Sequence, residues 1–172
     1  MTTQSFQTRP VLDTDRLFLR ELFVAIRAAE FSPLGHQTAR LLLDLQFDAQ
    51  SREYAARFNS ADDRIITVGD APVGRIWVDS RRDEWELIDI AIHPEHQRVG
   101  IASTVLHDLA CRADTAFVPL GLHVRRDNPT AQHVYFRTGF DIVESESDNV
   151  NLRLKRAACP RKTREGLTTA DR

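Results

Sequence analysis

The chain has 172 residues, 42% of them hydrophobic and 28% charged, which is enough for one water-soluble globular domain with a core of its own. The formal net charge of −2 excludes the basic surplus that attracts nucleic acid or an anionic membrane surface, so neither partner is expected. The two cysteines, Cys111 and Cys159, lie far apart and indicate neither a disulfide framework nor a metal site. Residues 1–10 are polar and lack the apolar core of a signal peptide, so we expect a cytoplasmic protein.

The first predicted elements are a strand and a short helix. Leu17, Leu19 and Leu22 stand between the charged residues Arg16, Arg20 and Glu21, with Phe18 on the other face, which predicts a strand over residues 15–22. Residues 23–31 follow as a short amphipathic helix that ends before Pro33.

Residues 38–58 predict a long helix with apolar side chains on two sides. Leu41 and Leu45 form one stripe, and Leu43 and Phe47 belong to another on the opposite side. One side is expected to cover the core and the other to pack against a neighbouring helix. Alternatively, one stripe lines an acceptor groove or a dimer contact.

Three strands are predicted next, over residues 64–68, 72–78 and 84–92. The first two are joined by Gly69–Asp70, a short connection that favours an antiparallel hairpin, so the three strands form a meander. A helix from Ile101 to about residue 112 then leads to a strand over residues 118–124. Because that strand follows a crossover helix, it should run parallel to the one that ends at Ile92.

The last predicted elements are a helix and a pair of strands. Asn128 suits the N-cap of the helix, Pro129 its first position, and Gly139 the position just after its end. Residues 140–143 and 150–154 close the chain as a hairpin-like pair. We therefore predict an α/β fold in which helices cover both faces of a mixed six- to seven-stranded sheet. A ligand should bind where the adjacent parallel strands diverge at their carboxyl ends.

The turn between the strand ending at Ile92 and the following helix has the composition of an anion site. Gly100 and Ala102 carry little or no side chain at a helix N-terminus, so an anion could approach free backbone N–H groups there. Gln97 and Arg98 add side-chain donors. The alternative is that Gly100 only relieves a tight turn.

Residues 97–102 have the pattern Gln-x-x-Gly-x-Ala, and residues 128–140 the pattern Asn-x-x-Ala-x-x-x-Tyr-x-x-x-Gly-Phe. Together these two motifs resemble the GNAT superfamily of N-acetyltransferases. The resemblance is close over residues 64–154 and rests on the order of elements alone before them. It implies the GNAT fold in a single domain over residues 1–156, followed by a polar tail over residues 157–172 that we expect to be flexible.

The resemblance also implies acetyl-CoA as the co-substrate, with its pyrophosphate at the turn after Ile92 and its pantetheine arm along the end of the preceding strand. The implied cofactor-binding residues are Ile90, Ala91, Ile92, Gln97, Arg98, Val99, Gly100, Ile101, Ala102, Ser103, Asn128 and Tyr135.

Acyl transfer to an amine needs a base, an oxyanion donor and an acid for the leaving thiolate. Tyr135 matches the tyrosine that protonates the CoA thiolate in the family, although it could simply pack as an aromatic residue. The candidate bases are Glu86, Asp89 and a chain of water molecules. Either carboxylate could instead form a structural ion pair with an arginine such as Arg75 or Arg125. The oxyanion donor is expected among backbone N–H groups near Ile90, which requires a local bulge.

The predicted function is transfer of an acetyl group from acetyl-CoA to a primary amine by direct attack in a ternary complex. A non-catalytic acyl-CoA sensor is the alternative. The acceptor stays open between a small amine and a protein amine, and a homodimer is compatible with the resemblance. Acidic side chains near the N-terminus would suit a cationic amine but could equally form a solvated helix face, namely Glu21, Glu30, Asp44 and Asp48. No metal is expected, because His93 and His96 lack a third ligand at a diagnostic spacing.

Overall fold

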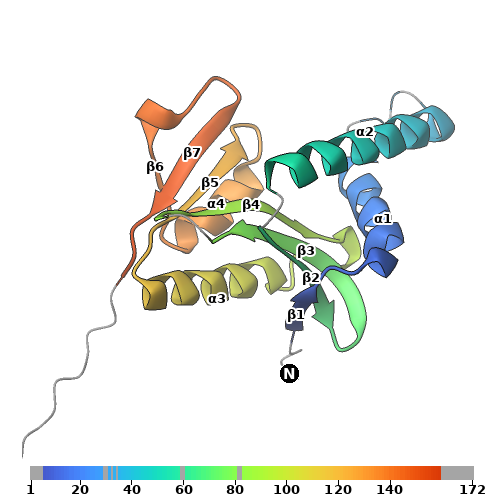
Figure 1. Cartoon of the computed structure of the whole chain (residues 1–172). Coiled ribbons are helices and arrows are strands. Elements are labelled where there is room, and N and C mark those ends of the chain that lie inside the picture. Colours follow the sequence, from blue (N-terminus) through green and yellow to red (C-terminus); the bar gives the residue numbers. More distant parts are fainter. Residues whose placement is uncertain are drawn as a thin grey trace, which may run out of the picture.

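The structure is a computed structural model, and it describes residues 6–28, 31, 33, 35–58, 61–80 and 83–159. These residues form a mixed seven-stranded sheet in the order β1-β2-β3-β4-β5-β7-β6 (Figure 1). The strands are β1 (Phe6–Pro10), β2 (Asp62–Val68), β3 (Ala71–Asp79), β4 (Trp85–Ile92), β5 (Leu120–Arg125), β6 (Asp141–Ile142) and β7 (Asn151–Arg156). The α-helices are α1 (Arg16–Arg27), α2 (His36–Arg57), α3 (Ile101–Ala116) and α4 (Pro129–Arg137).

Helices cover both faces of the sheet, as the sequence predicts (Figure 1). The main core lies between the sheet and α3, whose buried side chains recur at helical spacing from Ile101 to Ala113. Tyr135 of α4 and the following Phe140 belong to the same core. α1 and α2 pack together across the other face, where α1 contacts β3 and β4.

The strands β4 and β5 run parallel and pair only at their first residues. Trp85 lies opposite Leu120, and the pairing ends with Leu87 opposite Leu122. β4 continues to Ile92 and β5 to Arg125 without further pairing between them. The predicted divergence of the parallel strands is therefore present, and it leaves the last part of β4 with one unpaired edge.

A β-bulge interrupts β4 just before it leaves β5. Val78 of β3 pairs with Leu87, whereas the adjacent Trp77 pairs with Asp89, so Ile88 is the extra residue. Beyond the bulge, the His93 N–H donates to the Val73 carbonyl at 2.8 Å. Since donors alternate along an antiparallel pair, the N–H groups of Ile90 and Ile92 point away from β3 and into the gap toward β5.

The predicted strand over residues 15–22 is wrong, because these residues begin α1. Leu17 is 69% exposed, so the spacing of Leu17 and Leu19 does not mark the buried face of a strand. Leu19, Phe23 and Arg27 instead recur every four residues, and they line one side of α1. The first strand is β1, which the sequence analysis did not predict and which pairs antiparallel with β2.

The predicted helix over residues 23–31 is not a separate element, because its residues up to Arg27 are the end of α1, while residues 29 and 30 lie outside the described residues. The remaining predicted elements are present, with two additions. β6 and β7 pair antiparallel as expected, but β7 inserts between β6 and β5. On α2, Leu43 is buried whereas Leu41 and Leu45 are 62% and 59% exposed, so the stripe formed by Leu41 and Leu45 faces solvent in the described part of the chain. The predicted domain boundary at residue 156 stays a prediction, and most of the predicted tail lies outside the described residues.

Candidate active site

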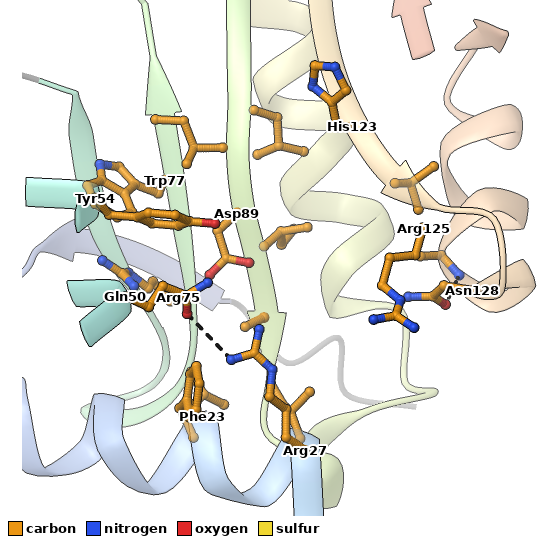
Figure 2. A pocket seen from close by; sticks show the side chains of 18 of the residues that line it. Phe23, Arg27, Gln50, Tyr54, Arg75, Trp77, Asp89, His123, Arg125 and Asn128 are labelled. Atoms are coloured by element: carbon orange, nitrogen blue, oxygen red, sulfur yellow. Dashed lines mark hydrogen bonds between the residues drawn. The ribbon is translucent and has the colours of Figure 1, made fainter. Parts of the chain in front are cut away.

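A cavity of about 420 Å³ lies where β4 and β5 diverge. One wall comes from α1, α2 and β3 and includes Phe23, Arg27 and Tyr54. The opposite wall comes from β5 and α4 and includes Asn128 and Tyr135. The floor is β4 from Leu87 to Ala91 (Figure 2). The cavity thus spans the gap that leaves the edge of β4 unpaired.

Asp89 is the residue that follows the bulge, and its side chain lies near the centre of this cavity (Figure 2). Burial raises the pKa of its carboxyl, while the nearby charges of Arg75 and Arg27 and the Ile90 N–H act in the opposite direction. The burial effect is the larger, so the carboxyl holds a proton more tightly than an exposed aspartate does. Such a carboxylate is a stronger base than an exposed aspartate.

Tyr135 reaches the same cavity from α4 and is only 8% exposed. The helix begins at Pro129 because the Asn128 side chain caps it, accepting a hydrogen bond from the Ala131 N–H at 3.1 Å. Burial and the negative charge of Asp89 raise the pKa of the Tyr135 hydroxyl. The hydroxyl therefore stays protonated and can serve as a proton donor.

Glu86, the other predicted base, is held by an arginine from β7. Arg153 is buried, and its Nη1 donates to both carboxylate oxygens of Glu86 at 2.7 Å. The same guanidinium also pairs with Glu84, and His123 lies 3.3 Å from Glu86. Glu86 does not line the cavity in the described residues, so the geometry favours Asp89 as the base.

The two arginines expected to compete for these carboxylates have other partners. Arg75 makes a bidentate pair with Asp63, at 2.7 and 2.6 Å. Arg125 makes a similar pair with Asp127, at 2.8 and 2.6 Å. Neither arginine holds Asp89 in an ion pair of the described residues, although the charge of Arg75 acts on it.

The turn from Gln97 to Ser103 begins where β4 ends. Gly100 has φ +89°, and α3 starts at the next residue, with its first hydrogen bond from the Thr104 N–H to the Gly100 carbonyl. The N–H groups of Ile101 to Ser103 therefore have no partner inside the helix. Ile101 itself is buried in the core, so this turn combines structural packing with an open helix N-terminus.

Gln97 differs from its expected role as a donor to an anion. Its Nε2 donates to the Ile92 carbonyl at 2.8 Å and ties the turn to the end of β4. Arg98 adopts φ +63° and is exposed, and Val99 is exposed beside it.

Among the predicted cofactor residues, Ile90, Ala91, Asn128 and Tyr135 line the cavity. Ile92 and the turn after it lie beyond its end. The structure adds residues that the sequence analysis missed, chiefly Arg27, Gln50, Tyr54 and Trp77. The four-residue spacing of Leu19, Phe23 and Arg27 was the available signal for Arg27, but the predicted strand obscured it.

The acidic side chains expected to suit a cationic amine are paired with arginines. Glu21 pairs with Arg40 at 2.6 Å, and Asp48 pairs with both Arg16 and Arg20 at 2.9 and 3.0 Å. Asp44 also lies within ion-pair distance of Arg20 and Arg40. Glu30 lies outside the described residues.

The part of the chain that the structure describes contains no group of three or more histidine, cysteine or acidic side chains placed to hold a metal ion. Within the same residues, no helix is both long and apolar enough to cross a bilayer.

Solved structures with a similar fold are acetyltransferases. The PaiA N-acetyltransferase of Thermoplasma acidophilum, solved with coenzyme A, matches with a TM-score of 0.69 and 15% identity over 89% of this chain and 99% of its own. The spermidine N-acetyltransferase of Vibrio cholerae, solved with CoA and spermine, matches with a TM-score of 0.65 and 20% identity over 91% of this chain and 97% of its own. An acetyltransferase from Thermus thermophilus gives a TM-score of 0.65 at 19% identity, covering 91% of this chain and 99% of its own.

At these identities the structures show a shared fold and leave the acceptor open. Comparison with curated proteins gives no significant match. The family model described as Acetyltransferase (GNAT) family matches residues 19–140, which include β4, the following turn, Asn128 and Tyr135. This match covers well over half of the chain, and the chain therefore belongs to the GNAT acetyltransferase family.

Proposed function

We propose that this protein transfers an acetyl group from acetyl-CoA to a primary amine by direct attack in a ternary complex. The observation that carries the proposal is that a carboxyl with a raised pKa, on Asp89, and a protonated phenol, on Tyr135, face one cavity at the open edge of β4. The match to the GNAT acetyltransferase family supports acetyl-CoA as the co-substrate, and a cytoplasmic location is part of the proposal.

The proposed reaction uses the two groups in sequence. The Asp89 carboxylate accepts a proton from the acceptor ammonium, and the neutral amine attacks the thioester carbonyl carbon to form the C–N bond. Ile90 and Ile92 direct their N–H groups into the gap, where backbone donors can hold the pantetheine arm and stabilise the oxyanion. The Ile90 N–H also interacts with Asp89, which positions the carboxyl beside these donors.

Collapse of the intermediate breaks the C–S bond. The departing thiolate takes the proton of the Tyr135 hydroxyl, and the resulting phenolate regains a proton from the amide nitrogen, which must lose one to become neutral. The high pKa of Tyr135 makes the phenolate a short-lived species. The products are the N-acetylated amine and CoA.

The first test measures thermal stability with and without acetyl-CoA, followed by CoA release over a panel of amines. A ligand that binds only the folded protein raises the unfolding midpoint by mass action. Release of CoA with at least one amine is expected. Stabilisation by acetyl-CoA without release for any amine would instead identify a non-catalytic acyl-CoA sensor.

Tyr135→Phe tests the proton donor. Loss of the hydroxyl should lower kcat by about a hundredfold or more, because general acid catalysis contributes on that scale. The midpoint shift produced by acetyl-CoA should stay as in the unaltered protein, since the ring still packs against Phe140. His133→Ala, on the exposed side of the same helix, is the matched control. Unchanged turnover in Tyr135→Phe would remove the hydroxyl from the mechanism.

A further inference from the structure

Within the proposed function, on which this inference rests, we infer that the acceptor is a small amine that also carries a carboxylate, such as an α-amino acid, and that Arg27 binds the carboxylate. Arg27 is the last residue of α1 and lines the cavity on the same side as Phe23 and Tyr54 (Figure 2). The charges around the cavity, and the partners that each already has, support this assignment.

Three arginines line the cavity, and they differ in their partners. Arg75 and Arg125 each make a bidentate pair with an aspartate, as described above. Arg27 makes no ion pair with a carboxylate of the described residues. Its contacts are a long hydrogen bond of 3.4 Å to the Gln50 Oε1 and the face of the Phe23 ring, 3.9 Å from the ring centre to the guanidinium carbon.

These contacts orient the guanidinium without neutralising it. The Phe23 ring restrains the position of the guanidinium, and Gln50 uses only one of the five N–H donors of Arg27. A planar fork with free donors matches the two oxygens of a carboxylate. The group lies near enough to act on the charge of Asp89, so one small ligand can reach both residues.

An amino acid would match the two charges of the cavity in the order that acetylation needs. Its ammonium would lie at Asp89, where it can lose a proton, and its carboxylate at Arg27. The same wall also carries Phe23, Tyr54 and Trp77, whose rings suit contact with an aliphatic or aromatic side chain.

A polyamine would match this cavity poorly. Each additional ammonium needs a carboxylate, and three acidic side chains on α1 and α2, Glu21, Asp44 and Asp48, already pair with arginines. A second positive charge near Asp89 would instead meet Arg27 and Arg75.

The experiment compares each amino acid with its amide, using phenylalanine with phenylalaninamide and leucine with leucinamide, and spermidine as the polycation. The amides lack the negative charge, yet more of their amine is neutral at a given pH, so without carboxylate recognition they should react faster. We expect kcat/KM to favour the acids by about 10- to 100-fold, the range of a charge-assisted hydrogen-bonded pair. Equal or faster reaction of the amides, or preferred acetylation of spermidine, would overturn the inference.

Arg27→Gln should remove the preference by raising KM for the acids about 10- to 100-fold while leaving KM for the amides nearly unchanged. Arg27→Lys should restore part of it, because the charge returns without the fork. The control is Arg52→Gln, on the exposed surface of α2. If Arg27→Gln kept the preference for acids, Arg27 would not be their receptor.

The same variants separate this inference from the proposed function. Arg27→Gln should retain the midpoint shift produced by acetyl-CoA, which depends on the opposite wall and the turn after β4. Activity that persists on amines but does not discriminate by carboxylate would leave the acetyltransferase intact and refute the acceptor class. Absence of both acetyl-CoA binding and CoA release would refute the proposed function, and the inference with it.

Discussion

The carboxyl of Asp89 has opposite consequences for stability and for chemistry. Its pKa in the folded protein is raised above the unfolded value, so the folded state binds this proton more tightly. The corresponding stability is present at low pH and is lost as the pH rises through the raised pKa. At neutral pH the ionised carboxyl therefore destabilises the fold, which is a cost that a purely structural residue would not be expected to carry.

Asp89→Asn should consequently raise the unfolding midpoint at neutral pH while it lowers kcat/KM by about a hundredfold. The gain in midpoint should shrink as the pH is lowered and vanish below about 3, where the carboxyl is protonated in both folded and unfolded protein. Midpoints measured across this pH range, together with CoA release, check both effects. A variant less stable than the parent at neutral pH would show that the ionised carboxyl is held by favourable contacts.

Single residues also mark the limit of what the sequence predicts about the site. The motif around Tyr135 identified a residue that does reach the cavity, and Asp89 was one of two candidate bases. The choice between Asp89 and Glu86 depended on Arg153, which is 67 positions from Glu86 in the chain. Such long-range ion pairs leave no local pattern. Arg27 was missed for another reason, because the predicted strand obscured its four-residue spacing from Leu19 and Phe23.

At the scale of elements, the turn between β4 and α3 is the proposed pyrophosphate site. An added Cβ at Gly100 would meet no atom within 4 Å, so the structure favours glycine there only through its φ of +89°. Gly69, in the hairpin between β2 and β3, has φ +57° and equally open space. The two glycines therefore form a matched pair for mutation.

Gly100→Glu should weaken acetyl-CoA binding by about tenfold or more, because it places bulk and negative charge at the helix N-terminus. Gly69→Glu imposes similar backbone strain and should leave the affinity near that of the parent. Titration calorimetry with acetyl-CoA distinguishes the two. Equal affinities in both variants would show that the pyrophosphate binds elsewhere.

The elements differ in how well their sequence patterns determined them. The meander, the crossover helix α3 and the capped helix α4 each combine a clear period with a turn or cap residue, and all were predicted. α1 was mistaken for a strand because Leu17 and Leu19 lie two residues apart between charged residues, which resembles the two-residue period of a strand. β1 is short, and its pairing with β2 joins segments more than fifty residues apart, which no local pattern reveals.

Two ion pairs hold segments near the two ends of the described chain. Asp114 of α3 accepts hydrogen bonds from Arg156 of β7 at 2.7 and 2.8 Å, and from the Cys159 N–H at 2.6 Å. The bond to Arg156 lowers the pKa of the Asp114 carboxyl. Near the N-terminus, Arg9 of β1 lowers the pKa of Asp15 in the same way, through bonds of 2.6 and 2.7 Å.

Because these folded-state pKa values are depressed, the stability they contribute is present above the unfolded pKa and is lost as the pH falls through the folded one. We expect the unfolding midpoint to fall steeply below about pH 4. Asp114→Asn should lower the midpoint at neutral pH and make this acid loss shallower. Thermal melts from neutral to acidic pH test the prediction, and an unchanged acid slope in the variant would assign the loss to other carboxyls.

The divergence of β4 and β5 divides the sheet into two portions. Asp89 belongs to the portion formed by β1 to β4, whereas Tyr135 follows β5 and packs with the portion that contains β7. At the junction, three residue pairs at one end and the covering helix α3 hold the two portions together. The spacing between the proposed base and the proposed acid therefore depends on how these two portions are joined, and a pantetheine arm bonded along the free edge of β4 would join them at the open end.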